Sequence, residues 1–293
     1  MKSSLKEKLI KCSLGVVSLV VPIIFIVILL HVFLAAIPAL SQLGLGLLDP
    51  DSVWRPRGIV PSFSILPMIL ATLYVSVLAV VIASPIACLC AVFINFYLDK
   101  KSSGILLAFV DMLAGVPSVI LGFIGLVVLV SSFERIFDMS AGQSILAASF
   151  ILAIILLPFI VSSYSESIAI AKARYGAASV ALGTSKEFVI LQVILPATRR
   201  SAATAITAAF GRAMGETMAV MMVIGNSPIF PRLFGRGLTI PGLTALEFGS
   251  AELGSMHLSA IYAANVILLV LICLIFTATY FLKKGLLKEH EKI

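Results

Sequence analysis

Charged residues are scarce in this sequence. Only 12% of its 293 residues are Asp, Glu, Lys or Arg, whereas 60% are hydrophobic. A soluble protein carries about twice that share of charge. The balance excludes an ordinary soluble protein and predicts one membrane domain spanning residues 1–293, without a soluble domain or a low-complexity tract.

The sequence lacks the motifs for ATP binding, catalysis, nucleic-acid binding and metal binding. The chain has no G-x-x-x-x-G-K-[ST] motif, so it does not bind ATP by that route. No nucleophile–base pair or nucleic-acid module is visible, and the net charge of +7 is explained by membrane topology. The four cysteines have no metal-binding spacing and are interpreted as small packing residues: Cys12, Cys88, Cys90 and Cys273. We therefore expect no enzyme, metal or cofactor.

Long apolar runs are what the sequence has instead. A helix needs about 20 such residues to cross a bilayer. Six runs qualify and predict an all-α protein with six transmembrane helices, the first uncleaved: Leu14–Ala39, Pro67–Phe96, Ile105–Val130, Ser144–Tyr164, Ala202–Ile224 and Leu258–Leu282. The core of the domain is expected over residues 67–282. Pro85 and Pro158 are candidate kinks within their spans.

The basic residues predict the orientation. With the N-terminus in the cytoplasm, fifteen Lys and Arg residues lie on that side and five on the other. Cytoplasmic loops collect Lys and Arg, so both termini are expected in the cytoplasm. Residues 165–201 then form the largest cytoplasmic loop, and residues 41–66 and 225–257 form external loops.

Arg212 and Glu216 lie inside the fifth predicted span, in the run AITAAFGRAMGETMAVMMVIG. An embedded charge costs a few kcal/mol or more. The spacing of four residues predicts that both side chains share one helix face. A guanidinium in a low-dielectric path suits a small oxyanion, and the alternative is a structural salt bridge. Asp111, in the third span, is a possible charge partner of Arg212 or of an interfacial base; a structural role is the other interpretation.

The cytoplasmic loop, residues 165–201, has its own pattern. An amphipathic stretch ends at Gly183, a typical residue after a helix end. Thr184 and Glu187 then form a capping-box spacing before the run FVILQVIL, which Pro196 is expected to close. A helix–turn–helix at the membrane surface follows. It either docks into a groove on a cytoplasmic partner or rests on lipid as an interfacial helix.

The stretch ALGTSKEFVILQVILP within this loop resembles the EAA loop of ABC-importer permeases. Gly183, Val193, Leu195 and Pro196 fall in register with that motif, while Ala177 replaces its glutamate and Ala178 follows. The resemblance implies the type I permease architecture. It also implies that this loop couples the chain to an ATPase subunit.

Two further stretches resemble permeases of the high-affinity phosphate (Pst) importer. DMLAGVPSVILGFIGL is similar to their third-helix signature, and GRAMGETMAVMMVIGN to the fifth-helix signature of the C-type subunit. The segment LTALEFGSAELGSMHLSAIYA also looks C-type. The resemblance implies that Arg212 and Glu216 take part in phosphate translocation across a bacterial or archaeal cytoplasmic membrane. It implies ATPase subunits, a second permease subunit in a heterodimer and an extracytoplasmic phosphate-binding protein as partners.

Other functions stay open at this point. The chain is alternatively a permease for another oxyanion, such as sulfate or molybdate, or the sister phosphate permease subunit. An ion-coupled carrier or channel needs no ATPase, and the EAA-like loop argues against it. An integral-membrane enzyme is not supported, because the sequence shows no nucleophile–base pair and no set of metal-binding residues.

Overall fold

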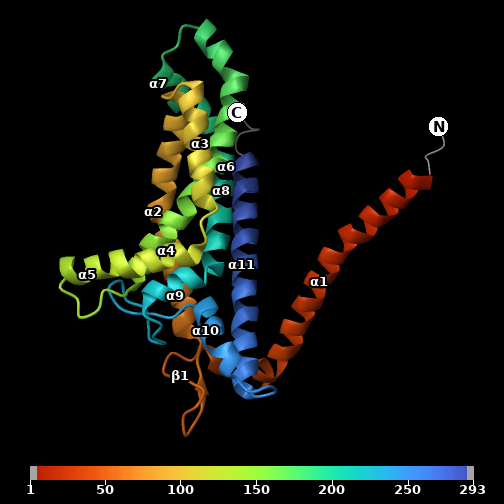
Figure 1. The fold of residues 1–293 in the computed structure, drawn as a ribbon, viewed down its shortest axis with the longest axis vertical. Coiled ribbons are helices and arrows are strands. Elements are labelled where there is room, and N and C mark those ends of the chain that lie inside the picture. The colour runs from red at the N-terminus through yellow and green to blue at the C-terminus, as the bar shows by residue number, and fades with distance from the viewer. Residues whose placement is uncertain (1–4, 289–293) are drawn as a thin grey trace.

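The structure is a computed structural model that describes residues 5–288. Five long helices build it: α1 (Leu5–Leu43), α2 (Leu66–Phe96), α6 (Ile145–Ala181), α8 (Leu195–Gly215) and α11 (Met256–Lys288). In Figure 1, α2, α6, α8 and α11 run roughly side by side along the long axis. The predicted all-α class is confirmed.

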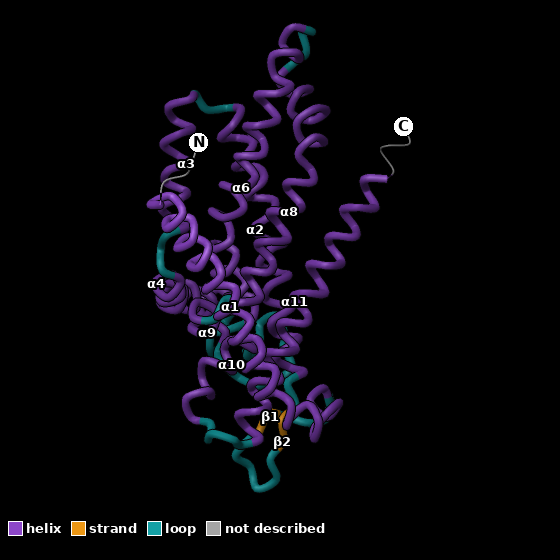
Figure 2. Tube along the Cα trace, turned by 90° about the vertical axis from the view of Figure 1, so that its right-hand side faces the viewer, coloured by secondary structure: helices purple, strands orange, loops and turns teal. Residues whose placement is uncertain are grey.

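Short elements connect the long helices. Figure 2 shows that the strands form one small hairpin at the lower end, in which Trp54 pairs with Phe63. The elements are η1 (Gly44–Leu48), β1 (Trp54–Arg55), β2 (Ser62–Phe63), α3 (Lys100–Ala114), α4 (Ser118–Ile124), the π-helical η2 (Gly125–Val130), α5 (Ser131–Ile136), α7 (Lys186–Phe188), the π-helical η3 (Val189–Ile194), α9 (Met218–Ile224), α10 (Ile240–Glu247) and η4 (Phe248–Ser250).

The centre of the core lies where α2 packs against α6. Small and β-branched residues line this contact, and Ala83, Ala87 and Ala148 are fully buried with Leu152 and Leu156. Small side chains let two membrane helices approach closely, which increases van der Waals contact where lipid offers no hydrophobic driving force.

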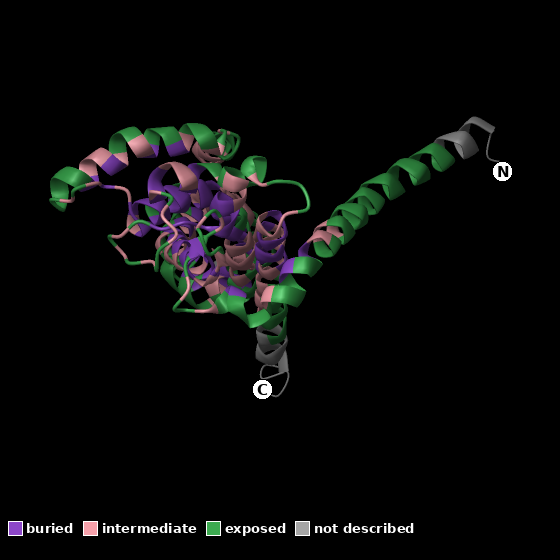
Figure 3. Cartoon of the chain, turned by 90° about the horizontal axis from the view of Figure 1, so that it is seen from below, coloured by how far each residue is buried: buried purple, intermediate pink, exposed green. Residues whose placement is uncertain are grey.

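Helix α1 stands away from this core. Figure 3 shows it almost wholly exposed, extending from the rest of the chain. It contacts α11 toward its C-terminal end, where Ala36 and Ala39 are fully buried. There the imidazole Nε2 of His31 lies 3.3 Å from the hydroxyl of Tyr262. The apolar surface along the rest of α1 is left for lipid or another chain to cover.

Within the described residues, five helical stretches are long and apolar enough to cross a membrane. They are Lys11–Leu48, Leu66–Phe96, Ser118–Ile136, Ile145–Ser179 and Met256–Phe281. The third predicted span is wrong as one continuous helix, because α3 ends at Ala114 and α4 begins at Ser118. The fifth predicted span is wrong for the same reason, because α8 ends at Gly215. The described residues therefore do not confirm six crossing helices.

The elements divide between two ends of the molecule. The turn before α7, the first turns of α1 and the last turns of α11 lie at one end, and the β-hairpin lies at the other (Figure 1). Asp99 begins α3 at the α7 end by accepting hydrogen bonds from the backbone N–H groups of Lys101 and Ser102. Hydrogen bonds from Ser102 lower the pKa of this exposed carboxyl. We call the two ends the α7 end and the hairpin end.

Candidate functional site

Glu216 and Thr217 interrupt the fifth predicted span. Glu216 has extended backbone angles, φ −69° and ψ 125°, and its N–H donates to the carbonyl of Ala213 at 3.2 Å. Its carboxylate accepts a 3.4 Å hydrogen bond from the N–H of Ala219 in the first turn of α9. Gly215 and Thr217 are both poor helix formers, and the carboxylate satisfies a donor that the new helix leaves free.

The predicted geometry of Arg212 and Glu216 is therefore wrong. Arg212 lies in the last turn of α8, whereas Glu216 follows the helix end and its carboxylate caps α9. In the part of the chain that the structure describes, neither residue forms an ion pair. A structural salt bridge between them does not account for the two embedded charges.

A second break lies between α3 and α4. Pro117 has no N–H, and its ring disfavours a helical backbone at Val116. Gly115 and Val116 instead donate to the carbonyls of Met112 and Leu113, at 3.1 and 3.2 Å, in a tight turn. The chain then changes direction, and α4, η2 and α5 run across the bundle in Figure 1.

The two breaks are connected by direct packing of α4 against α9. Gly122 lies at the contact, where an added Cβ would lie 2.7 Å from the Cα of Ala219. Such a distance is too short for two carbon atoms, so only glycine fits this approach. The helix segments that follow the two breaks are thus held against each other.

Asp111 lies on α3, one turn before its break. Its Oδ1 accepts a 2.6 Å hydrogen bond from the hydroxyl of Ser162 on α6. It forms no ion pair with Arg212 or with an interfacial base within the described residues. The contact ties α3 to α6, which is the structural role.

Arg212 is exposed on the surface of this chain. Its guanidinium carbon lies 5.9 Å from the centre of the Phe159 ring on α6. Since no described carboxylate pairs with Arg212, its hydrogen-bond donors remain available to a ligand.

An open cavity of about 350 Å³, lined by both apolar and polar groups, continues from Phe159 between α6 and α8. It lies toward the α7 end, since residues after Phe159 on α6 and before Arg212 on α8 line it. Hydroxyls and a second arginine give it its polar character: Ser163, Ser167, Arg200, Ser201 and Thr204. We call it the α6–α8 cavity. Sequence reasoning missed it, because it depends on how two helices face each other.

The turn at the α7 end reproduces the helix break predicted at Gly183. This glycine has φ +67°, a backbone conformation that L side chains disfavour. Thr184 was expected to cap the next helix, but its hydroxyl donates to the carbonyl of Ser179 at 2.8 Å, at the end of α6. Ser185 caps α7 instead, accepting a 3.3 Å hydrogen bond from the N–H of Phe188.

The predicted coupling residues fall into two groups. Ala177, Ala178 and Gly183 are exposed around the turn. Leu195 and Pro196 lie beyond η3, in the first turn of α8. Pro196 follows the run FVILQVIL as predicted, and no helix ends there, because the backbone stays helical from η3 into α8.

Apolar side chains on both sides of the turn at the α7 end are exposed. The side chain of Leu182 is 80% exposed and that of Phe188 is 50% exposed. Lys186 lies over the ring of Tyr97, with 4.0 Å between its Nζ and the ring centre, and this contact braces the turn against the end of α2. The surface offers apolar anchors on a braced hairpin, as groove docking requires.

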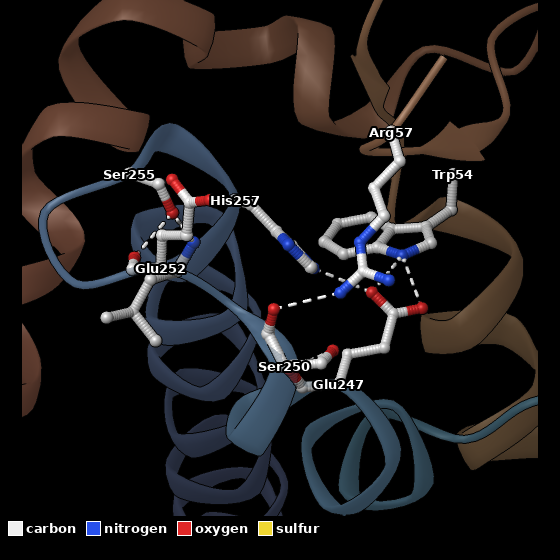
Figure 4. A network of polar contacts seen from close by, with 8 residues as sticks. Trp54, Arg57, Glu247, Ser250, Glu252, Ser255 and His257 are labelled. Carbon is white, nitrogen blue, oxygen red and sulfur yellow. Dashed lines mark hydrogen bonds and ion pairs between the residues drawn. The ribbon is translucent and has the colours of Figure 1, made fainter.

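A polar network joins elements at the hairpin end (Figure 4). Both carboxylate oxygens of Glu247 accept hydrogen bonds from Nε1 of Trp54, at 3.0 and 2.9 Å, and His257 Nε2 lies 2.7 Å from Oε2. Arg57 donates to the carbonyl of Ser250 at 2.9 Å. Sequence reasoning gave His257 no role, because its tryptophan neighbour lies far away in the sequence.

These features define a class of protein: a multi-pass membrane protein with interrupted helices and an exposed apolar turn. The chain belongs to the family described as the binding-protein-dependent transport system inner membrane component, which matches residues 83–284. It is an ABC-importer permease that resembles the C-type phosphate permease, so the predicted class of protein is confirmed.

Named relatives agree with this class. The chain is 32% identical over 251 residues to the probable phosphate transport system permease protein PstC of Methanocaldococcus jannaschii, covering 79% of each chain. It is also 32% identical over 197 residues to the probable ABC transporter permease protein YqgH of Bacillus subtilis, covering 67% of this chain and 64% of that one.

One solved structure supports the fold alone. A chain of the inward-facing MetNI methionine ABC transporter matches with a TM-score of 0.55 at 18% identity, covering 75% of this chain and 93% of that one. The shared fold confirms the predicted type I importer architecture and carries no information about the transported substrate.

Proposed function

We propose that this chain is a transmembrane subunit of an ATP-driven importer of inorganic phosphate. The carrying observation is Arg212, an exposed arginine at the end of α8 that no described carboxylate neutralises. Phosphate carries one to two negative charges at pH 7, and the planar guanidinium offers it two donors at once. The similarity to proteins named as phosphate permeases supports this choice of oxyanion.

Glu216 takes a different part from Arg212. Its carboxylate caps α9, so it fixes the break beside Arg212. The break leaves Arg212 on the last turn of α8, where small movements of α9 change its surroundings. We propose that this arrangement binds phosphate weakly enough for release.

The proposed function requires partners. ATPase subunits bind the turn at the α7 end, which then faces the cytoplasm together with both termini. A second permease subunit completes the path as a heterodimer, and an extracytoplasmic phosphate-binding protein docks at the hairpin end. ATP hydrolysis belongs to the ATPase subunits. The alternatives of another oxyanion, such as sulfate or molybdate, and of the sister phosphate permease subunit keep the same architecture.

Uptake of radiolabelled phosphate by the assembled transporter in cells tests the proposal. Arg212→Ala is expected to abolish uptake while the complex still assembles, and Arg212→Lys to impair it because lysine lacks the planar fork. Arg199→Ala, on the same helix but far from the break, is the control and is expected to transport normally. Normal uptake by Arg212→Ala would remove Arg212 from the path, and excess sulfate that suppresses uptake would favour a broader oxyanion permease.

A further inference from the structure

The α6–α8 cavity contains a second arginine that the proposed function does not use. Arg200 lies twelve residues before Arg212 on α8, so about 18 Å of helix separates them. Residues four apart form a ridge that winds slowly around an α-helix, and this ridge runs from Arg200 through Thr204 and Ala208 to Arg212. Thr204 and Ala208 line the same cavity as Arg200.

Helix α6 supplies the opposite wall of the cavity. Phe159, Ser163 and Ser167 also lie four residues apart, and all three line it. Because α6 runs toward the α7 end and α8 runs away from it, Phe159 lies beside Arg212 and Ser167 lies toward the level of Arg200. The cavity thus leads from Arg200 to Phe159, whose ring centre lies 5.9 Å from the guanidinium carbon of Arg212.

The polar groups of this cavity suit an anion. Within the described residues, Arg200 has no carboxylate partner, and the hydroxyls of Ser163 and Ser201 donate to no protein acceptor. Both hydroxyls can therefore turn toward a ligand. Thr204 already donates to the carbonyl of Arg200 at 2.9 Å, and Ser167 donates to the carbonyl of Ser163 at 3.3 Å.

Negative charge is absent from the lining. Glu166, the nearest acidic residue along α6, is exposed and does not line the cavity. A volume of about 350 Å³ also admits a tetrahedral oxyanion together with water. The positive charge, the hydroxyl donors and the volume of the cavity all fit a small oxyanion.

We infer that the α6–α8 cavity is a second binding position for a small tetrahedral oxyanion, with Arg200 as its cationic group and Ser163 and Ser201 as donors. This inference rests on the proposed function, in which an anion leaves Arg212 toward the α7 end. Arg200 then provides a second positive charge for the anion between Arg212 and the cytoplasm. The position holds the anion through one fixed charge and rotatable hydroxyls, which favours brief occupancy.

Charge-selective labelling tests the inference without depending on transport. Thr204→Cys serves as the reporter in a chain whose four native cysteines are replaced by serine, assembled with its transporter subunits in membrane vesicles. The vesicles are open to reagent from the α7 end. The rate of modification by a sulfonate-bearing methanethiosulfonate is divided by the rate with its trimethylammonium counterpart.

Arg200→Gln is expected to lower this anionic-to-cationic rate ratio about threefold or more, because one positive charge beside the reporter is lost. Arg199→Gln removes the neighbouring charge, which does not line the cavity. This variant is expected to change the anionic-to-cationic rate ratio by less than about 1.5-fold, half of the threefold change expected for Arg200→Gln. Inorganic phosphate at millimolar concentration is expected to slow the anionic reagent in the parent chain. That protection is expected to weaken in Arg200→Gln and in the double variant Ser163→Ala/Ser201→Ala.

The labelling results separate failure of the second binding position from failure of the proposed phosphate function. A ratio that Arg200→Gln leaves unchanged, or a reporter that neither reagent modifies, overturns the second position even if Arg212 proves essential for phosphate uptake. If sulfate protects the reporter and phosphate does not, the second position stands and the proposed phosphate function fails. Assembly of every variant is checked by co-purification with the ATPase subunits, so that misfolding is not read as lost binding.

Discussion

Gly122 offers a sharp test of how the two helix breaks are linked. The substitution Gly122→Ala would place a Cβ 2.7 Å from the Cα of Ala219, 3.0 Å from the sulfur of Met222 and 3.2 Å from the carbonyl oxygen of Ala219. Carbon atoms pack best at about 3.5–4.0 Å, so α4 and α9 have to separate by about 1 Å. Backbone atoms cannot rotate aside as a flexible side chain would.

The expected cost follows from overpacking a tight contact, about 1–3 kcal/mol of stability. Because α9 begins at Met218, directly after the break, its displacement also moves Glu216 relative to Arg212. We therefore expect Gly122→Ala to lower both the unfolding temperature of the purified transporter and its rate of phosphate uptake.

Gly104→Ala is the matched control. A Cβ added to Gly104, inside α3, meets no heavy atom within 4 Å. Alanine at a helix interior is favoured over glycine by about 1 kcal/mol, so this variant is expected to be as stable as the parent or more so. Equal stability and equal uptake in the two variants would refute the close approach of α4 and α9 as a constraint on the site.

Three further predictions concern the two ends of the molecule. Leu182→Asp is expected to reduce co-purification of the ATPase subunits about tenfold or more, because one buried apolar anchor is lost. Leu253→Asp, at a leucine that is 94% exposed near the hairpin end, is the control and is expected to retain the ATPase subunits. Equal retention by the two variants would rule out Leu182 as an anchor. Trp54→Phe removes the donor to both oxygens of Glu247 and is expected to cost about 1–3 kcal/mol in thermal unfolding; an unchanged unfolding temperature would contradict a stabilising network. Asp99→Ala is expected to cost about 1 kcal/mol and to speed hydrogen exchange in the first turn of α3, and unchanged exchange would count against the cap.

Hydropathy predicted most of the long helices from the sequence. The expected run Pro67–Phe96 differs by one residue from α2, Leu66–Phe96, because a bilayer demands long apolar segments that composition reveals directly. The expected run Ser144–Tyr164 was too short, since α6 extends to Ala181. Helix formation there continues past the apolar stretch into residues that favour helix but not lipid.

The breaks were harder to predict than the spans. Pro85 and Pro158 were the candidate kinks and lie inside α2 and α6, whereas the break in the third span lies at Pro117. Gly115 precedes Pro117, and this glycine and proline together favour a turn that a single proline does not enforce. Mean hydropathy is averaged over such positions, so it predicted one span where the structure has the two helices α3 and α4.

The sequence pointed to three embedded charges, but it did not predict their geometry. The scarcity of embedded charge singled out Arg212, Glu216 and Asp111. Their contacts depended on the break at Glu216 and on the approach of α6, which no sequence spacing encodes. Arg200 was counted only as a basic residue of the cytoplasmic side, because its neighbours Ser163 and Ser167 lie on another helix.

The two helix breaks also have a consequence for hydration. Lipid tails offer no hydrogen bonds, so irregular backbone is tolerated at membrane depth only inside protein or beside water. Gly115 and Gly215, which end the helices at the two breaks, are both exposed on this chain. The surfaces around these two glycines are therefore expected to face water or another protein chain rather than fatty acyl chains.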